Sequence, residues 1–432
     1  MYWEAINECM PRDEREQLQL ERLQATLFRV YMNVPFYRKT FDTLGIDPDA
    51  FRSLDDLRKL PFTTKEDLRA SYPYGMFAVP LREVVRIQAS SGTTGAPTVV
   101  GYTRNDLKHW SNLVARILTA AGVTQNDIVQ IAFDYGLFTG AFGFHYGAER
   151  IGASVIPISS GNTRRQLKIM QDFRTSALLC TPSYALALAE AIQESGTSVS
   201  SLSLKYGLFG AEPWSEAMRS ELQDKLKIIA TDNYGLSEVM GPGVAGECLE
   251  RNGLHINEDH FFVEVINPET LEPVAPGETG ELVITTLTRE AFPVIRFRTR
   301  DLTRLLPEPC VCGRTLTRMT KVMGRTDDMI KLRGITVFPS QIEAVLCATE
   351  GVEPHFQIEI DRKGALDEMT LLVEVSDSLF SDEIKDLQGF MDRIRRDLES
   401  EVGFPVEVKP VEKKSLERFD GKARRVIDRR KK

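Results

Sequence analysis

The chain has 432 residues, of which 42% are hydrophobic and 27% are charged, a balance typical of a folded globular protein and not of a disordered one. Its length exceeds the roughly 250–300 residues that one hydrophobic core supports, so two or three domains are expected. Fifty-four basic and 62 acidic residues leave a formal charge of −8, which argues against a large nucleic-acid-binding surface.

The amino-terminal stretch and the cysteine content predict a cytoplasmic protein. The segment MYWEAINECMPRDEREQ carries charges of both signs without the apolar core of a signal peptide, and no uncharged apolar run of membrane-spanning length follows. Six cysteines are too few for a disulfide scaffold in a chain of this length. We therefore expect reduced or metal-bound thiols, and neither membrane nor nucleic acid as a partner.

The pattern along the chain predicts an α/β fold. Residues 1–75 form a helical leader, in which the apolar positions of 14–34 recur at helical spacing. Short β-rich runs then alternate with helix-length segments, which predicts parallel sheets with helices. Residues from about 245 to 323 predict a small β subdomain. A composition change follows, so we predict a large N-terminal domain of residues 1–326 and a small α+β C-terminal domain of residues 327–432.

The loop SSGTTGAP, residues 90–97, contains the first chemical signal. Hydroxyls and small residues surround two glycines, as in loops that present backbone N–H groups to phosphate. The glycines are too close together for the G-x-x-x-x-G-K-[ST] motif, and no lysine follows the second one. A hairpin loop between two strands is the alternative interpretation.

Three further stretches contain candidate nucleotide-binding residues. In DNYGLSE, which follows an apolar strand, Tyr234 could stack on a base and Glu238 could ligate Mg²⁺. In RFRTRDL, Asp301 could accept hydrogen bonds from ribose hydroxyls, although a surface ion-pair cluster is the alternative. Lys422 follows a glycine in DGKARRVID, which alone would be interpreted as a solvated basic tail or a nucleic-acid patch.

A second constellation predicts a structural metal site. Cys248, His255, Cys310 and Cys312 lie within the β-rich region. Thiolates and imidazole suit tetrahedral Zn²⁺, and four protein ligands would leave no open position for chemistry. His260 could substitute for His255, and buried thiols without metal are the alternative.

An aromatic stretch with small residues, FDYGLFTGAFGFHYGAE, predicts a pocket for a flat apolar ring. Tyr135 and Ala141 are the preferred pocket residues, and Ala211 and Pro242 are further candidates. Ordinary core packing is the alternative for each of these aromatic side chains.

In this order, these stretches resemble the adenylate-forming superfamily of AMP-binding enzymes and, more narrowly, its phenylacetate–coenzyme A ligases. The resemblance covers nearly the whole chain and includes the segments LPFTTKEDLR, SSGTTGAPTVVGYT, LFGAEPW, YGLSEVMGPGVAGEC, RFRTRDL, GRTDDMIKLRGITVFPSQIE and GKARRVID. It implies an ATP- and Mg²⁺-dependent ligase with a mobile C-terminal domain. Such an enzyme activates phenylacetate, or a close aryl-acetate, as an acyl-adenylate and transfers the acyl group to coenzyme A.

The resemblance also implies the roles of individual residues. Lys422 would bridge the carboxylate and the α-phosphate during adenylation, Glu238 would hold Mg²⁺, and Asp327 would be the hinge. Ala96 stands where close relatives commonly carry lysine, so Lys65 is the candidate for the missing cation; a simple role in the first turn of a helix is the alternative. The nucleotide would contact Ser90, Ser91, Gly92, Thr93, Thr94, Gly95, Gly210, Ala211, Glu212, Pro213, Asn233, Tyr234, Gly235, Ser237, Asp301 and Arg325.

Two other functions stay open from the sequence. An aryl-acid adenylating enzyme could load a carrier-protein thiol in place of free coenzyme A. A non-catalytic nucleotide- or nucleic-acid-binding module would have only the basic carboxyl-terminal stretch in its favour. A homodimer is an open alternative for the assembly.

Overall fold

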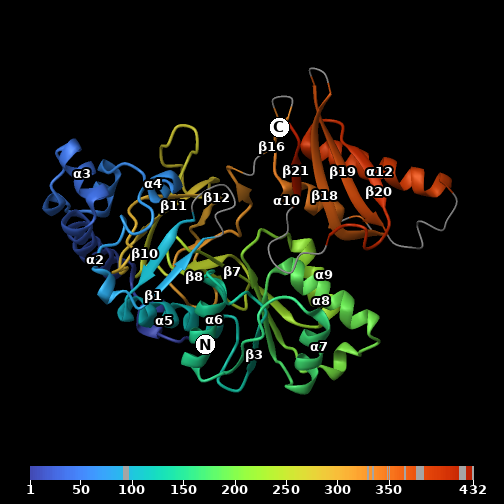
Figure 1. Ribbon diagram of the computed structural model, residues 1–432, viewed down its shortest axis with the longest axis horizontal. Coiled ribbons are helices and arrows are strands. Elements are labelled where there is room, and N and C mark those ends of the chain that lie inside the picture. The colour runs from blue at the N-terminus through green and yellow to red at the C-terminus, as the bar shows by residue number, and fades with distance from the viewer. Residues whose placement is uncertain are drawn as a thin grey trace. The chain divides into compact units, whose positions relative to one another are not determined.

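The computed structural model divides the chain into two compact units, whose elements are drawn in Figure 1. The described residues are 1–90, 97–327, 330–332, 335–347, 349, 351–363, 366–375, 384–417 and 425–430. The first unit comprises Met1–Cys180, Leu202–Ala211 and Ile229–Lys321, and the second comprises Thr181–Ser201, Glu212–Ile228 and Val322–Lys432. Among the described helices, none combines the length and the apolar character that a bilayer crossing requires.

The longest of the described helices, α2 (Arg12–Asn33), buries one face. The helices of the first unit are α1 (Ala5–Glu8), α2, α3 (Pro35–Leu44), α4 (Lys65–Ala70), α5 (Arg104–Ala120), α6 (Gly140–Ile151) and α7 (Thr163–Asp172), with the 3₁₀ turns η1 (Pro48–Ala50), η2 (Leu54–Lys59) and η3 (Leu81–Glu83). On α2 the buried residues include Leu23, Leu27 and Val30, which are spaced three and four apart. This spacing places them on one face of a helix, as the sequence pattern predicts.

A nine-stranded sheet forms the centre of the first unit. Its strands are β3 (Ile128–Ile131), β4 (Ser154–Ile156), β5 (Ala177–Cys180), β6 (Tyr206–Gly210), β7 (Ile229–Leu236), β8 (Gly241–Glu247), β9 (Leu254–Ile256), β13 (Leu305–Leu306) and β14 (Arg318–Met319). Their order is β13-β14-β9-β8-β7-β6-β5-β3-β4, with parallel pairing from β4 to β7 and antiparallel pairing beyond. All four residues of β5 are buried, which is typical of a strand covered on both faces.

Two smaller antiparallel groups complete the first unit. β1 (Arg86–Ala89) and β2 (Val99–Tyr102) form a ribbon, seen side by side in Figure 1. β10 (Phe261–Ile266), β11 (Gly280–Thr286) and β12 (Phe297–Thr303) pair in that order. The latter strands lie within the range where the sequence predicts a small β subdomain.

The second unit is built around a mixed sheet of order β20-β19-β18-β21. Its elements are α8 (Pro182–Glu194), η4 (Val199–Ser201), α9 (Glu216–Leu226), β15 (Gly324–Arg325), β16 (Ile330–Leu332), β17 (Ile335–Val337), α10 (Pro339–Cys347), β18 (Val352–Lys363), β19 (Leu366–Val375), α12 (Ile384–Val402), β20 (Glu407–Val411) and β21 (Val426–Asp428). Ile358 of β18, Leu371 of β19 and Ile394 of α12 are fully buried in one shared core. Figure 1 shows this sheet and α12 in orange and red.

The predicted fold class is confirmed, since a large part with a parallel-rich sheet precedes a smaller α+β part. The predicted boundaries at residues 75, 245, 323 and 326/327 stay predictions. The division into compact units assigns α8 and α9 to the second unit, and the last segment of that unit begins at Val322.

Candidate active site

Lys65 and Glu238 form an ion pair in the first unit. Lys65 is the first residue of α4, which Thr64 caps by accepting a hydrogen bond from the Asp67 backbone N–H. Glu238 follows β7 in the turn that leads to β8. The Lys65 Nζ lies 3.1 Å from Glu238 Oε1, with 38% of the lysine side chain and 7% of the glutamate side chain exposed. Lys65 therefore begins a helix and also contacts the carboxylate predicted to hold Mg²⁺.

Tyr234 and Asp301, both expected to contact the nucleoside, bind each other directly. The Tyr234 hydroxyl on β7 donates to Asp301 Oδ2 on β12 at 2.6 Å, and both residues are buried. The Asp301 backbone N–H also donates to the Thr299 hydroxyl. The bond between Tyr234 and Asp301 joins the central sheet to the smaller antiparallel sheet and holds an aromatic ring beside a carboxylate.

The ends of β6 and β7 bring further predicted residues together. Gly210 pairs with Asn233 in the parallel ladder, and a Cβ on Gly210 would lie 2.4 Å from the Asn233 carbonyl oxygen. Ala211 follows with a φ of 71°, in the left-handed region. Gly235 packs against Gly241 where β7 and β8 meet. Ligands of open α/β sheets bind beyond such carboxyl ends of parallel strands, so the backbone here suits the predicted nucleotide site.

The remaining predicted nucleotide residues have local partners or lie outside the described residues. Ser90 follows β1, and its hydroxyl accepts a hydrogen bond from the Thr98 backbone N–H. In the second unit, Glu212 accepts hydrogen bonds from the Ser183 backbone and hydroxyl, and Pro213 follows it. The loop residues Ser91, Gly92, Thr93, Thr94, Gly95 and Ala96, and likewise Lys422, fall outside the described residues.

The helix α6 lies against β8, and these two elements carry Ala141 and Pro242, which the sequence predicts to line the pocket. Ala141 is fully buried, and a Cβ on Gly143 would lie 2.7 Å from Pro242 Cγ. The hydroxyls of Thr139 and Ser237 are 3.1 Å apart, which links α6 to the turn that carries Glu238. Sequence reasoning missed Thr139, whose only sequence signal is its position before the helix.

Tyr135 has an extended polar environment on the exposed side of α6. Its hydroxyl lies 3.1 Å from His145 Nδ1, and His145 Nε2 lies 3.1 Å from Glu149 Oε1. Burial raises the pKa of Tyr135 above its usual value, with the negative charge of Glu149 acting in the same direction. His145 and Glu149 were not among the predicted site residues, although their i, i+4 spacing indicates one helix face.

Arg325 and Asp327 interact within the second unit. The Arg325 Nε and Nη2 donate to the two carboxylate oxygens of Asp327 at 2.8 and 3.0 Å. Asp327 follows β15 at an exposed position, five residues after Val322. This two-point contact fixes their relative orientation, because an arginine fork matches both carboxylate oxygens.

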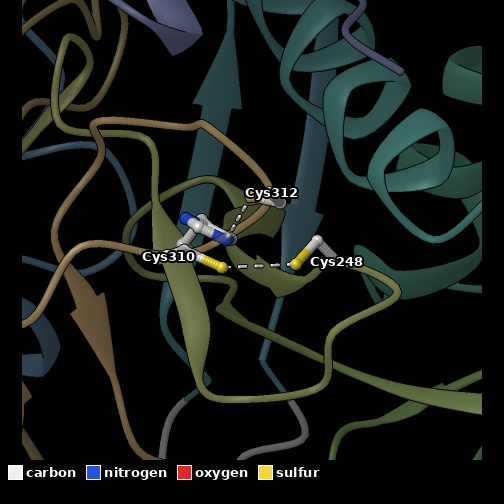
Figure 2. Close-up of side chains that lie close together, drawn as sticks. Cys248, Cys310 and Cys312 are labelled. Carbon is white, nitrogen blue, oxygen red and sulfur yellow. Dashed lines mark hydrogen bonds between the residues drawn. The ribbon is translucent and has the colours of Figure 1, made fainter.

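Cys248, His255, Cys310 and Cys312 come together in the first unit, as Figure 2 shows for the three labelled cysteines. All four ligand atoms lie within 4.8 Å of one another. The Cys248 and Cys310 sulfurs are 3.8 Å apart, and Cys312 Sγ is 3.4 Å from His255 Nε2. A tetrahedral zinc, with bonds of about 2.3 Å to sulfur and 2.0 Å to nitrogen, places its ligand atoms about 3.5–3.8 Å apart. The cluster geometry therefore fits a zinc ion.

Two residues of this cluster, His255 and Cys312, are shifted toward the form that binds a metal. Cys248 is not, because burial raises the pKa of its thiol to about 12, so a metal would have to displace its proton. Burial lowers the pKa of His255 to about 3, and the charges of Arg314 and Arg318 act in the same direction, so the imidazole is neutral. Burial opposes ionisation of Cys312, but hydrogen bonds from the backbone and side chain of Arg314 outweigh it and lower the pKa of this thiol. Neutral imidazole and thiolate are the forms that bind zinc.

His260, the alternative ligand, belongs to another cluster. Its Nδ1 lies 2.6 Å from the Thr288 hydroxyl and its Nε2 lies 3.3 Å from Asp259 Oδ2. Burial lowers the pKa of His260 to about 3; Asp259 opposes this shift, and Arg116, Arg22 and His109 reinforce it. The buried imidazole therefore stays neutral in the folded protein over the pH range in which an exposed histidine takes up a proton.

We expect this buried histidine to make stability depend on pH. Below pH 6.5 the unfolded chain binds a proton at residue 260 that the folded chain does not bind. The free energy of unfolding therefore decreases as the pH is lowered. Between pH 7 and pH 5 this group contributes about 2 kcal/mol to the loss. Urea unfolding of the parent and of His260→Gln at both pH values checks this prediction. An equal pH dependence for both proteins would contradict it, and His145→Gln, at a more exposed position, is the control.

Comparison with known proteins identifies relatives of both parts of the chain. The family model described as AMP-binding enzyme matches residues 47–288, and that of the AMP-binding enzyme C-terminal domain matches residues 334–430. A phenylacetate-coenzyme A ligase of Escherichia coli (strain K12) is 51% identical over 97% of this chain and 95% of the relative. One of Thermus thermophilus is 49% identical over 100% of both chains. The crystal structure of a 2-hydroxyisobutyryl-CoA ligase in the postadenylation state matches with a TM-score of 0.94 and 30% identity, over 99% of this chain and 92% of that one.

Proposed function

Since the chain belongs to the family of AMP-binding enzymes, we propose that it is an ATP-dependent ligase that activates phenylacetate and transfers it to coenzyme A. A carboxylate oxygen of the acid attacks the α-phosphorus of ATP, and pyrophosphate leaves. The coenzyme A thiol then attacks the carbonyl carbon of the acyl-adenylate, and AMP leaves. The observation that carries this proposal is identity of about half of all residues to phenylacetate-coenzyme A ligases over essentially the whole chain.

The contacts within the first unit support roles for its polar residues. Tyr234 and Asp301, joined at 2.6 Å, would bind the adenine ring and the ribose hydroxyls. Glu238 would hold Mg²⁺, which neutralises phosphate charge when bound. Lys65 would add a second positive charge beside Glu238. No protein nucleophile is required, because the reaction needs only positioning and charge neutralisation.

The loop and the strand ends would complete the nucleotide site. The N–H groups and hydroxyls of residues 90–95 would orient the leaving pyrophosphate. Gly210, Ala211 and Asn233 would form its wall at the carboxyl ends of β6 and β7. Tyr135, Ala141, Ala211 and Pro242 would line the pocket for the aryl ring, and Arg325 would lie near ribose or phosphate.

A panel of aryl acids tests the choice of substrate and of thiol. Pyrophosphate release is measured with phenylacetate, hydroxyphenylacetate, indoleacetate and benzoate, with and without free coenzyme A. We expect the highest kcat/KM with phenylacetate and continuous turnover with coenzyme A alone. A requirement for a carrier protein would establish the alternative of an aryl-acid adenylating enzyme, which whole-length relatives that are coenzyme A ligases do not favour. A cytoplasmic location and assembly as a homodimer stay predictions from the sequence.

We propose that Asp327 is the hinge between the two half-reactions. In support, the related 2-hydroxyisobutyryl-CoA ligase has been solved in both the postadenylation and the thioesterification state. Asp327→Pro would fix φ at this residue and should slow thioester formation by about tenfold, roughly 1.4 kcal/mol in the barrier, while adenylation persists. Single-turnover kinetics of both half-reactions measure this. Asp327→Ala, which removes the contact with Arg325 but leaves the backbone unrestricted, is the control; unchanged thiolation in Asp327→Pro would overturn the hinge.

We also propose that Cys248, His255, Cys310 and Cys312 hold one structural Zn²⁺. Metal analysis of the purified protein should find about one zinc per chain. Cys312→Ser should lower the zinc content and reduce the melting temperature by at least about 5 °C, because binding of a structural metal contributes to the folding free energy. Cys347→Ser, in the second unit, should leave the zinc content unchanged. Metal-free protein of the same stability would refute this proposal.

A further inference from the structure

The loop that carries two of the four cluster residues also receives the start of the chain. We call residues 310–315 the cluster loop and residues 1–33, with α1 and α2, the N-terminal segment. The Tyr2 hydroxyl donates to the Cys312 carbonyl oxygen at 2.7 Å, and the Thr315 backbone N–H donates to the Glu8 carbonyl oxygen at 3.0 Å. The cluster loop therefore contacts the N-terminal segment on both sides of Arg314.

Arg314 links a cluster thiol to a buried carboxylate of the N-terminal segment. Its Nη1 lies 3.7 Å from Cys312 Sγ, and its Nε donates to Glu8 Oε2 at 2.7 Å. The side chains of Arg314 and Glu8 are only 3% and 1% exposed. The other Glu8 oxygen accepts hydrogen bonds from the backbone N–H groups of Trp3 and Glu4. Displacing the cluster loop would separate the guanidinium of Arg314 from the carboxylate of Glu8. Breaking a buried ion pair in this way is strongly unfavourable, because each buried charge loses its partner.

The next residue of the loop anchors α2 in the same way. Arg15 is fully buried, and its guanidinium donates to the Thr315 carbonyl oxygen and to the Thr315 hydroxyl, both at 2.8 Å. The shape of the loop matters as well, because Gly313 has a φ of 86° and a Cβ there would lie 2.4 Å from the Tyr2 hydroxyl oxygen. The N-terminal segment thus docks in part on one specific conformation of the cluster loop, while other contacts, such as those of Arg12 and Gln19 with Glu258, lie outside the loop.

We propose that zinc binding fixes the N-terminal segment to the rest of the first unit, and we call this arrangement a metal-dependent clasp. The ion would cross-link the cluster loop to Cys248, after β8, and to His255, on β9. Without an ion, the side-chain contacts that the structure shows between the loop thiols and these partners are Cys310 Sγ to Cys248 Sγ at 3.8 Å and Cys312 Sγ to His255 Nε2 at 3.4 Å. This inference rests on the proposed zinc site, but not on the proposed ligase activity.

Hydrogen exchange of the full-length protein, followed by mass spectrometry, tests the clasp. The protein is compared as purified, after treatment with a zinc chelator, and after re-addition of Zn²⁺, with zinc content measured in each sample. We expect chelation to accelerate amide exchange in peptides from residues 1–33 at least tenfold, and Zn²⁺ to restore protection. Peptides from β5 in the first unit and from α12 in the second unit should stay protected.

A variant on the other side of the contact provides the matched test. Glu8→Gln removes the charge that faces Arg314 without touching a zinc ligand, so it should retain zinc and accelerate exchange in residues 1–33. Glu14→Gln, at an exposed position on α2, should change neither. If the purified protein contains zinc but its amide exchange rates in residues 1–33 do not change on chelation, the clasp is overturned and the zinc site stands. Equal acceleration in β5 would show that the ion holds the whole unit, and absence of zinc would overturn both proposals; ligase activity is assayed separately.

Discussion

Replacing Lys422 by alanine should lower the rate of adenylate formation by about two to three orders of magnitude, the usual effect of losing one preorganised charge in a transition state. Thioester formation from supplied acyl-adenylate should survive, since the lysine is needed only where the carboxylate and the α-phosphate carry adjacent negative charge. Lys422 lies outside the described residues, so this expectation rests on its place after Gly421 in the segment GKARRVID.

The two half-reactions must be measured separately to test this role. Pyrophosphate release in a single turnover without coenzyme A reports adenylation, and thioester formation from synthetic phenylacetyl-adenylate reports thiolation. Lys409→Ala, which removes an exposed lysine of β20, is the control and should change neither rate. An equal fall of both rates in Lys422→Ala would contradict the assignment to adenylation.

Lys65→Ala should reduce kcat/KM for ATP by about tenfold or more, as expected for the loss of one partly desolvated charge contact. The physical reason is the position of its ammonium group, 3.1 Å from the Glu238 oxygen that is proposed to hold Mg²⁺. The loop SSGTTGAP has Ala96 where a cation would otherwise neutralise phosphate. Lys65 is therefore expected to supply the charge that this loop lacks.

A double mutant determines whether the two positions share one task. Ala96→Lys alone should leave activity unchanged or raise it modestly, and in the Lys65→Ala background it should restore ATP use. Lys59→Ala, an exposed lysine paired with Asp56, is the control. Unaltered ATP kinetics in Lys65→Ala would mean that the cation lies elsewhere.

The parallel part of the fold was predictable because its signals are local. Buried runs such as Ala177–Cys180 have no charged position, and several candidate nucleotide-binding residues lie in the last part of β6 and β7 or directly after these strands in the sequence. Their contacts were not predictable. Lys65 meets Glu238, and Tyr234 meets Asp301, across elements that are far apart in the chain, and periodicity within one segment contains no information about such pairs.

The cysteine cluster shows where strand register decides between alternatives. Sequence spacing allowed either His255 or His260 as the fourth ligand. In the fold, β9 pairs with β14 so that His255 lies opposite Arg318, next to the loop that carries Cys310 and Cys312. His260 follows the strand and turns to Asp259 and Thr288. The docking of the N-terminal segment through Glu8 and Arg314 had no sequence signal, because isolated charges are usually solvated.

The central claim, activation of a carboxylate as an acyl-adenylate, is tested most directly by following an oxygen atom. The protein is incubated with Mg²⁺, ATP, coenzyme A and phenylacetate labelled with oxygen-18 in its carboxylate, and the nucleotide product is analysed by mass spectrometry. The attacking carboxylate oxygen becomes bonded to the α-phosphorus and leaves with AMP when the thiol displaces it. We predict one labelled oxygen in each AMP, formed with one pyrophosphate and one phenylacetyl-CoA. Unlabelled AMP, or ADP with the label in inorganic phosphate, would contradict the account.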